Sequence, residues 1–269
     1  MTPAMETKLG RLIMGDFRLG SLVAALALLV SATFASAADI RVLNANALTG
    51  AMKDLAAGFT KDTGTAVTFV GVSPGQVEQR VKAGEVYDLV ITATASAQAF
   101  EKEGRWIAGS RQKLARVGIG FAVRDGVKVD LSSVESTRQA LLDAKSITYS
   151  DSSTGGLSGI NAQKVLANLG LIDAMRAKTK LSRALADGQS MIAKGDIDIG
   201  LFNLSEIPRA PGVVRAGPVP AAVQVYINYD AALPVTNSSP DAALVLLKYF
   251  RRPVSRVVWD KAGLELAGD

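Results

Sequence analysis

Hydrophobic positions along this chain follow two patterns that alternate from one segment to the next. Short, nearly continuous apolar runs such as residues 87–92 are typical of strands covered on both faces. Between such runs, apolar residues recur every three or four positions, as at Met52, Leu55, Ala56 and Phe59, which share one face of a helix. Because the two patterns alternate, the sequence predicts an α/β fold of mostly parallel sheets flanked by helices.

The same reading applies to the rest of the chain. The apolar runs predict strands at residues 39–44, 66–70, 87–92, 117–123, 146–150, 197–202 and 223–228. The helical repeats predict helices after Gly50, from Ser73 to Gly84, and at residues 96–104, 135–144, 159–169, 188–194 and within 239–263. Pro74 lies just inside the start of its helix and Gly84 just beyond the end, which is the usual asymmetry of helix termini.

The alternation of strand and helix occurs in two runs, which two long strands connect. The sequence therefore predicts two lobes between which the chain crosses twice, a two-strand hinge, and both chain ends in the first lobe. We expect residues 38–122 and 220–269 in lobe 1 and residues 123–219 in lobe 2. Ligands of such folds bind at the carboxyl ends of strands and at helix N-termini, so one cleft can receive both sets of ends.

The N-terminal segment has the composition of a secretory signal peptide. Arg18 precedes a long apolar stretch within residues 19–37, and Ala35 and Ala37 supply a small-x-small cleavage site. A membrane anchor is the alternative, but the apolar core is short against the roughly 20 residues that a span requires. We therefore expect export to the periplasm, with cleavage near Ala37.

Composition removes several classes of function. The chain has no Cys and no His, which excludes disulfides, a lipid anchor on Cys, zinc and copper sites, and Ser-His-Asp or Cys-His catalysis. The net charge of +5 is mild and comes without a basic stripe interleaved with aromatic residues, so a nucleic-acid partner is set aside. We expect a monomer without cofactor or metal, and the weak positive balance is compatible with an anionic ligand.

Four turns that follow predicted strands share small hydroxyl or amide side chains: residues 46–49, 72–76, 92–94 and 150–158. Most of them lead into a helix whose first backbone N–H groups have no partner within the helix, and such ends suit an anion. Ordinary N-capping explains any one turn alone. The turn at 150–158 is stronger, because eight of its nine residues are Ser, Thr, Gly or Asp.

These turns supply most of the candidate ligand-binding residues, and two further candidates lie elsewhere in the chain. The candidates are Asn46, Ala47, Ser73, Gly75, Thr92, Ser152, Ser153, Thr154, Gly155, Arg183 and Asn203. Arg183 can hold a carboxylate through two parallel hydrogen bonds, with a solvated loop arginine as the plain alternative. Asn203 ends a predicted strand. Asp151 could cap a helix, act as a base or have no role in the site.

The order and spacing of several segments resemble the periplasmic molybdate-binding proteins and related type II solute-binding proteins. The segments that carry the resemblance are residues 47–49, 59–64, 75–81, 88–93 and 194–200. The resemblance spans nearly the whole mature chain. It implies two α/β lobes, a hinge, an oxyanion held by hydroxyls and backbone N–H groups, and a partner ABC permease in the inner membrane.

The chain departs from this family at three positions. Ala47 stands where the family places a ligand serine, Pro74 follows Ser73, and Asn203 stands where the family has a tyrosine. These departures favour a small anion other than tetrahedral molybdate, such as an organic carboxylate. A binding protein that serves an ABC importer is the leading hypothesis.

An enzyme on the same scaffold is the second hypothesis, because some proteins that look like this family are isomerases of small unsaturated tricarboxylates, such as aconitate isomerase. Moving a double bond requires proton removal beside a carboxylate. In that case Asp151 or an activated serine would be the base, and Arg183 with the helix ends would hold the acid groups. A periplasmic sensor partner is a third possibility that shares the binding chemistry.

Overall fold

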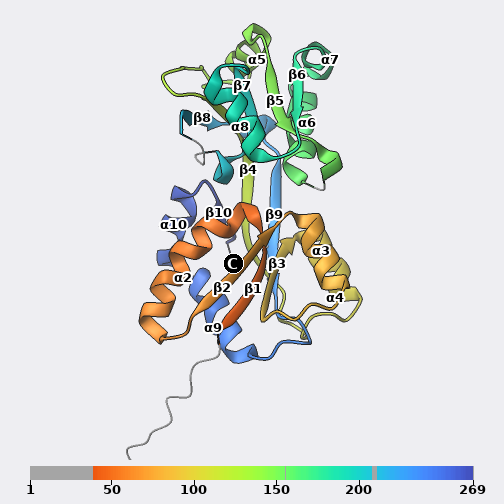
Figure 1. Cartoon of the computed structure of the whole chain (residues 1–269), viewed down its shortest axis with the longest axis vertical. Helices are drawn as coiled ribbons and strands as arrows, with labels where there is room; N and C mark the ends of the chain where they lie inside the picture. The colour runs from red at the N-terminus through yellow and green to blue at the C-terminus, as the bar shows by residue number, and fades with distance from the viewer. Residues whose placement is uncertain (1–38, 155, 208–210, 269) are drawn as a thin grey trace, which may run out of the picture. The chain divides into compact units, whose positions relative to one another are not determined.

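The computed structural model describes residues 39–154, 156–207 and 211–268. The signal-peptide prediction and its cleavage site therefore lie outside the described residues, as does Gly155. Strands and helices alternate through most of the described chain (Figure 1). The strands are β1 (Ile40–Ala45), β2 (Val67–Val72), β3 (Leu89–Ala93), β4 (Gln112–Arg124), β5 (Ile147–Ser150), β6 (Thr179–Ser182), β7 (Ile199–Asn203), β8 (Val213–Pro218), β9 (Tyr226–Ala232) and β10 (Glu265–Leu266).

Helices of two kinds connect the strands. The α-helices are α2 (Thr49–Thr63), α3 (Pro74–Lys82), α4 (Thr94–Lys102), α5 (Val134–Asp143), α6 (Leu157–Asn168), α7 (Ile172–Arg176), α8 (Leu185–Lys194), α9 (Pro240–Phe250) and α10 (Arg256–Lys261). The short 3-10 helices are η1 (Asn46–Leu48), η2 (Ser152–Thr154), η3 (Leu204–Glu206), η4 (Ala221–Val223) and η5 (Pro253–Ser255).

Strand β1 pairs in parallel with β2 and β3, and β9 joins β3 from the other side in the antiparallel direction. Alternate residues of β1 point to opposite faces, so Val42 belongs to one buried cluster and Leu43 to another. Helices α2, α9 and α10 cover the first face, and α3 and α4 cover the second (Figure 1). This layer arrangement explains why these strands are apolar on both faces.

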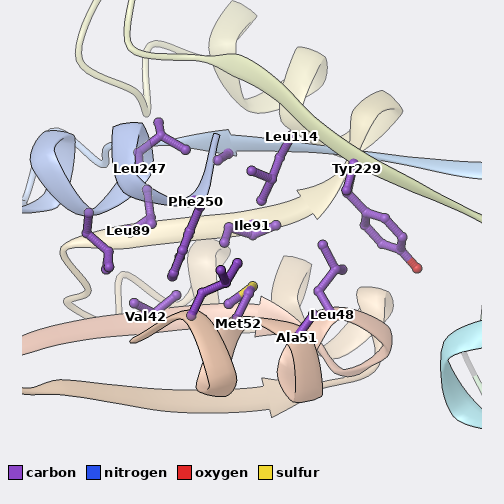
Figure 2. Close-up of a cluster of buried hydrophobic side chains, with 14 of the residues drawn as sticks. Val42, Leu48, Ala51, Met52, Leu89, Ile91, Leu114, Tyr229, Leu247 and Phe250 are labelled. Atoms are coloured by element: carbon purple, nitrogen blue, oxygen red, sulfur yellow. The ribbon is translucent and has the colours of Figure 1, made fainter. Parts of the chain in front are cut away.

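The larger cluster joins the two ends of the described chain. Side chains of α2, such as Met52, meet Ile91 of β3 and Phe250 of α9 in this cluster (Figure 2). Trp259 of α10 is fully buried, and its indole N–H donates to the Phe250 carbonyl at 2.9 Å. The C-terminal helices therefore complete the core that the N-terminal strands begin.

The other group of strands has its own core. Strand β5 pairs in parallel with β6 and β7, while β7 and β8 run antiparallel to β4. Phe121 of β4 packs with Leu141 of α5 and Val165 of α6, whereas Ile192 of α8 packs with Phe202 on the opposite face. Helices α5, α6 and α7 thus cover one face and α8 the other.

Strand β4 belongs to both groups of strands. It pairs with β9 as far as Gly118 and with β7 from Ile119 onward. The structure thus confirms the predicted two-lobed α/β fold, with a mixed sheet in each lobe because β4, β8 and β9 add antiparallel pairs to the parallel ones. The lobe limits at residues 122 and 220 stay a prediction.

Most of the predicted elements are present, and the differences are local. β6, β8, β10 and α7 were not predicted, β4 begins at Gln112 rather than near residue 117, and α8 begins three residues before Gly188. Gly64 ends α2 in the left-handed conformation, with φ of 75°, which the residue type favours. Among the described residues, no helix combines the length and the apolar character that crossing a membrane requires.

Candidate functional site

Among the helices that begin at the carboxyl ends of strands, α3, α6 and α8 form the candidate site. Helix α6 follows β5, and its Gly159 leaves no space for a side chain, because a Cβ atom there would collide with the carbonyl oxygen of Ser150. The first turn of α6 therefore lies directly against the end of β5. The N-cap position is Gly156, and no side chain caps this helix.

Helix α8 follows β6 in the same manner. A Cβ atom at Gly188 would lie 2.8 Å from the Phe202 ring and 2.9 Å from Ser182 Oγ, so the first turn of α8 needs glycine to approach β6 and β7. The N-cap residue is Ala184, which has no side chain able to cap, and Arg183 immediately precedes it. Helices α6 and α8 thus both begin without a side-chain cap.

Helix α3 begins in a different way. Ser73 is its N-cap, and Ser73 Oγ accepts from the Gln76 backbone N–H at 3.4 Å while Gln76 Oε1 accepts from the Ser73 N–H at 3.2 Å. The two residues form a reciprocal capping box. Ser73 therefore has a structural role at this helix end, whatever else it contacts.

The N-termini of α3, α6 and α8 surround one cavity of about 400 Å³. Its described lining comes from both lobes, and β9 is among the strands that contribute to it. The lining residues are Asn46, Gly71, Val72, Ser73, Pro74, Gln76, Ser150, Gly156, Leu157, Ser158, Arg183, Ala184, Leu185, Asn203, Glu206, Ile227 and Tyr229. Three of the four turns singled out in the sequence thus meet at one place, with Arg183 and Asn203 beside them.

The cavity has one basic and one acidic side chain among its described lining residues. Arg183 is solvent-exposed, so its guanidinium is available to a ligand that enters from water. Glu206 is only 5% exposed, and its Oε2 accepts from Asn203 Nδ2 at 2.9 Å. The phenol of Tyr229 is also buried, and its pKa is raised, first by burial and then by the charge of Glu206. Tyr229 is therefore a neutral hydroxyl at any physiological pH.

Tyr229 connects the cavity to the core of lobe 1. Its ring lies at one end of the buried cluster, near Leu48, and its hydroxyl points away from the other labelled side chains (Figure 2). The residue thus packs as a hydrophobic side chain on one side and lines the cavity on the other.

Other candidate residues are described but do not line this cavity. They are Ala47, Gly75, Thr92, Ser152 and Ser153. Ala47 is packed in the core of lobe 1, Gly75 lies in the first turn of α3, and Ser152 and Ser153 form η2 with Thr154. Their membership of a ligand site stays a prediction.

The polar groups near the turn after β3 form hydrogen bonds within lobe 1. Thr94 Oγ1 donates to the buried carboxylate of Asp230 at 2.6 Å, and Arg111 pairs with the other oxygen of Asp230 at 2.6 Å. Thr92 is fully buried and is paired with Asp230 in the register of β3 and β9. This turn joins strands of lobe 1 together and contributes nothing to the described cavity wall.

Asp151, the candidate base, lies outside the described lining. Its Oδ1 accepts from the backbone N–H of Ser153 at 2.9 Å, and this bond, followed by one from the Ser153 side chain, lowers the pKa of Asp151. A carboxylate with a lowered pKa is a weaker base, and Arg183 lowers it further. The structure thus gives Asp151 the role of ordering the turn that precedes α6.

Glu206 and Tyr229 are two cavity residues with functional side chains that sequence reasoning missed. Glu206 follows β7 in a short Asn-Leu-Ser-Glu turn, so its position after a strand was the available signal. Tyr229 lies inside β9, and an aromatic residue within a strand is usually interpreted as part of the packed core. The start of α8 was missed because it has neither a capping residue nor a Pro.

A second cavity of about 580 Å³ lies elsewhere in lobe 2. Arg124, Asp143 and Ile199 are among its lining residues, which places it beside α5 and at the amino end of β7. Ligands of α/β sheets bind at the opposite, carboxyl ends of strands, so we assign the functional site to the smaller cavity. The described residues contain no group of three or more acidic side chains that could hold a metal ion.

Comparison with known proteins gives consistent matches over the described chain. A family described as bacterial extracellular solute-binding protein matches residues 40–265. Aconitate isomerase of a Pseudomonas species is 27% identical over 233 residues, covering 84% of this chain and 87% of that protein. The molybdate-binding protein ModA of Azotobacter vinelandii is 30% identical over 249 residues, covering 88% of this chain and 94% of that protein.

Among solved structures, the substrate-binding domain assigned to a molybdenum ABC transporter of Clostridium difficile superposes with a TM-score of 0.72. Its sequence identity is 16%, and the match covers 86% of this chain and all of that chain. At this identity the match shows the fold, which is the type II periplasmic binding protein fold.

Proposed function

Because the chain belongs to the bacterial extracellular solute-binding protein family, we propose that it captures a small organic anion in the periplasm for an ABC permease of the inner membrane. Export through a signal peptide cleaved near Ala37 is part of the proposal. One observation carries it: the N-termini of α3, α6 and α8 and the side chain of Arg183 surround a single cavity.

The strength of such contacts is sufficient for useful binding. A helix N-terminus contributes about 0.3–1 kcal/mol toward an anion and up to about 2 kcal/mol when partly buried. A hydrogen bond to a charged group contributes about 1.5–3 kcal/mol. Micromolar affinity requires about 8 kcal/mol, which three helix ends and one guanidinium can approach together.

The walls of the cavity favour an organic acid over a tetrahedral oxyanion. Apolar side chains of Pro74, Leu157, Leu185 and Ile227 lie beside the polar ones. Such walls can bury carbon atoms, whereas molybdate or sulfate offers only oxygen atoms. Ala47 also brings no hydroxyl to this region, because its side chain is a methyl group packed in the core.

Isomerisation of an unsaturated tricarboxylate is the second candidate function. Two observations favour it, namely the similarity to aconitate isomerase and the carboxylate of Glu206 in the cavity wall. In this candidate, Glu206 rather than Asp151 would remove a proton from one carbon beside the double bond. Return of the proton at the other end of the allylic system shifts the double bond without any oxidant or reductant.

The test is a ligand screen of the mature protein by thermal shift. The ligands are molybdate, tungstate, sulfate, phosphate, and di- and tricarboxylates that include cis- and trans-aconitate. A ligand at 100-fold excess over its Kd should stabilise the fold by about 2.7 kcal/mol. We expect stabilisation by one or more carboxylates, and tight binding of molybdate alone would contradict the choice of an organic anion.

Each stabilising ligand is then incubated with the protein in deuterated water and followed by NMR. A binding protein leaves the ligand unchanged. Deuterium exchange or conversion of cis- to trans-aconitate would instead establish the isomerase, and its loss in Glu206→Gln would identify the base.

A further inference from the structure

Arg215 connects the two lobes through its side chain. It lies on β8, which pairs with the lobe 2 half of β4 at Ala122. Arg215 Nη2 donates to the carbonyl of Leu204 in η3 at 2.7 Å and to the carbonyl of Ala262, at the end of α10, at 3.5 Å. Helix α10 lies beside α2 and packs in the core of lobe 1 through Trp259 (Figure 1). A side chain of lobe 2 thus reaches the C-terminal segment of lobe 1.

Gly263 allows this contact to be close. A Cβ atom at Gly263 would lie 2.9 Å from Arg215 Nη2 and 3.0 Å from the carbonyl carbon of Leu204. The residue also has a φ of 79°, which residues other than glycine rarely adopt. The backbone after α10 therefore lies directly against both the guanidinium and η3.

Leu204 belongs to the same junction. Its side chain packs against the main buried cluster of lobe 1 and against the cluster beneath α8 in lobe 2. A Cβ atom at Gly120 would collide with it, so β4 needs glycine where Leu204 crosses the strand. Asn203, which immediately precedes η3, lines the candidate cavity. Arg215 therefore holds a segment that continues directly into the cavity wall.

Carbonyl groups, rather than a carboxylate, hold Arg215 in place. It forms no ion pair with any residue of the described chain, and its Nε is buried without a hydrogen-bond partner there. Burial lowers the pKa of its guanidinium. A partly buried charge without a counter-charge and a buried donor without an acceptor both oppose folding. Arg215 is thus a poor choice for stability alone, and what it supplies is a fixed geometry.

We propose that Arg215 is a positioning residue of the binding site, which ties η3 to the C-terminal segment of lobe 1 and so keeps the lobes at the angle at which the cavity binds its ligand. This inference rests on the proposed function, since it concerns the same cavity. A protein that populates the binding-competent arrangement for only a fraction of the time has an affinity reduced by that fraction.

Arg215→Met separates geometry from stability, because methionine fills much of the same space without the charge or the donors. We expect the urea midpoint to stay close to that of wild type, since the lost hydrogen bonds are offset by removal of the half-buried charge. Affinities for cis-aconitate, trans-aconitate and molybdate are measured by isothermal titration calorimetry. Those that bind wild type should bind the variant at least about fivefold more weakly, as for a competent population of about one fifth.

The angle between the lobes is measured on the ligand-free protein. The chain has no Cys, so Lys61→Cys in α2 and Lys164→Cys in α6, both at exposed positions, provide one spin-label site in each lobe. Double electron–electron resonance gives the distribution of distances between the two labels. We expect a narrow distribution for wild-type Arg215 and a broader one for Arg215→Met.

Two further variants complete the series. Arg215→Lys keeps the charge and a donor, and it should recover part of the affinity and of the narrow distribution. Arg105→Met is the matched control, because Arg105 also donates to a backbone carbonyl, that of Val81 at 3.3 Å, but within lobe 1 alone. It should change neither the affinities nor the distances.

Two results would overturn this inference while leaving an anion-binding function intact. One is an affinity of Arg215→Met equal to that of wild type. The other is an unchanged distribution of distances, which would make any loss of affinity the effect of a merely structural role. If none of the anions binds wild type, the proposed function itself fails, and the distance distribution still tests the connection between the lobes.

Discussion

Arg183 lines the candidate cavity and is exposed to water. Its side chain is exposed, so its removal changes the cavity more than it changes the core. We expect Arg183→Ala to weaken binding of the preferred carboxylate by about 10- to 100-fold, the equivalent of one charge-assisted hydrogen bond. The melting temperature of the ligand-free protein should be nearly unchanged.

The matched control is Arg176→Ala. Arg176 is an exposed arginine of the same lobe, on α7, where it pairs with Asp173 and lines no described cavity. Calorimetric titration of both variants separates a local contact from a loss of net charge. Equal affinities for the two variants would show that Arg183 is only a solvated loop residue.

Tyr229 makes a prediction about stability at high pH. An unfolded tyrosine loses its proton near pH 10, but burial and the charge of Glu206 raise the pKa of Tyr229 in the fold. Above pH 10 the unfolded state therefore binds fewer protons than the native state, and the free energy of unfolding falls. This residue alone should contribute a slope of about 1.4 kcal/mol per pH unit between roughly pH 10 and 12.

Tyr229→Phe should remove that slope and leave the contributions of the other tyrosines, which the two proteins share. Urea unfolding at several pH values from 9 to about 12 measures the difference between the variants. Parallel curves for wild type and variant would mean that the phenol ionises in the folded protein.

At the scale of helices, two serines allow a matched comparison. Ser73 caps α3 beside the cavity, and Ser133 caps α5 through the same reciprocal pattern with Ser136. Removing either cap should lower the free energy of unfolding by about 1 kcal/mol. Only Ser73→Ala should also lower the affinity for the ligand, because Ser73 lines the cavity and Ser133 does not.

Chemical denaturation gives the stability of both variants, and titration calorimetry gives the affinity. An affinity loss in Ser73→Ala beyond that of Ser133→Ala belongs to the contact with the ligand. If the two variants bind equally well, Ser73 acts as a cap alone.

Elements with a buried face were predictable from the sequence. Helix α2 shows this, since Met52, Leu55, Ala56 and Phe59 are all buried in one cluster, as their spacing predicted. Strand β3 is buried along its whole length and was predicted from its apolar run. In both cases the periodicity of the sequence records the burial directly.

Elements at sheet edges were not predictable in this way. The side chains of β6 are mostly exposed or half-buried, and those of β8 are mostly half-buried, so neither has an apolar run or an alternating pattern. Their pairing with β5 and β4 depends on residues far away in the chain. The same reason explains Glu206, whose place in the cavity depends on how η3, α3 and β9 meet.

At the scale of the whole molecule, β4 links the two cores. One half of the strand pairs with β9 and packs against the core of lobe 1, and the other half pairs with β7 and packs in lobe 2. At the crossing, Gln224 Nε2 donates to the Ile119 carbonyl at 2.9 Å, and Gln224 Oε1 accepts from the Ile119 N–H at 2.8 Å. A side chain thus supplies the strand with a hydrogen-bonding partner where it passes between lobes.

This connection predicts that the lobes unfold together. The two tryptophans of the chain, Trp106 and Trp259, lie in the clusters of lobe 1, so tryptophan fluorescence reports on that lobe.

Leu141→Ala makes a cavity in the core of lobe 2 and should lower the free energy of unfolding by about 2–5 kcal/mol. The control is Leu142→Ala, which should lower it far less, because Leu142 lies on the same helix but is 38% exposed. Because unfolding of lobe 2 strips β4 of its partners β7 and β8, we expect the fluorescence midpoint of Leu141→Ala to fall together with the midpoint from circular dichroism. A fluorescence midpoint equal to that of Leu142→Ala, with a biphasic dichroism curve, would mean that lobe 1 keeps its fold after lobe 2 is lost and that β4 is a tether between independent units.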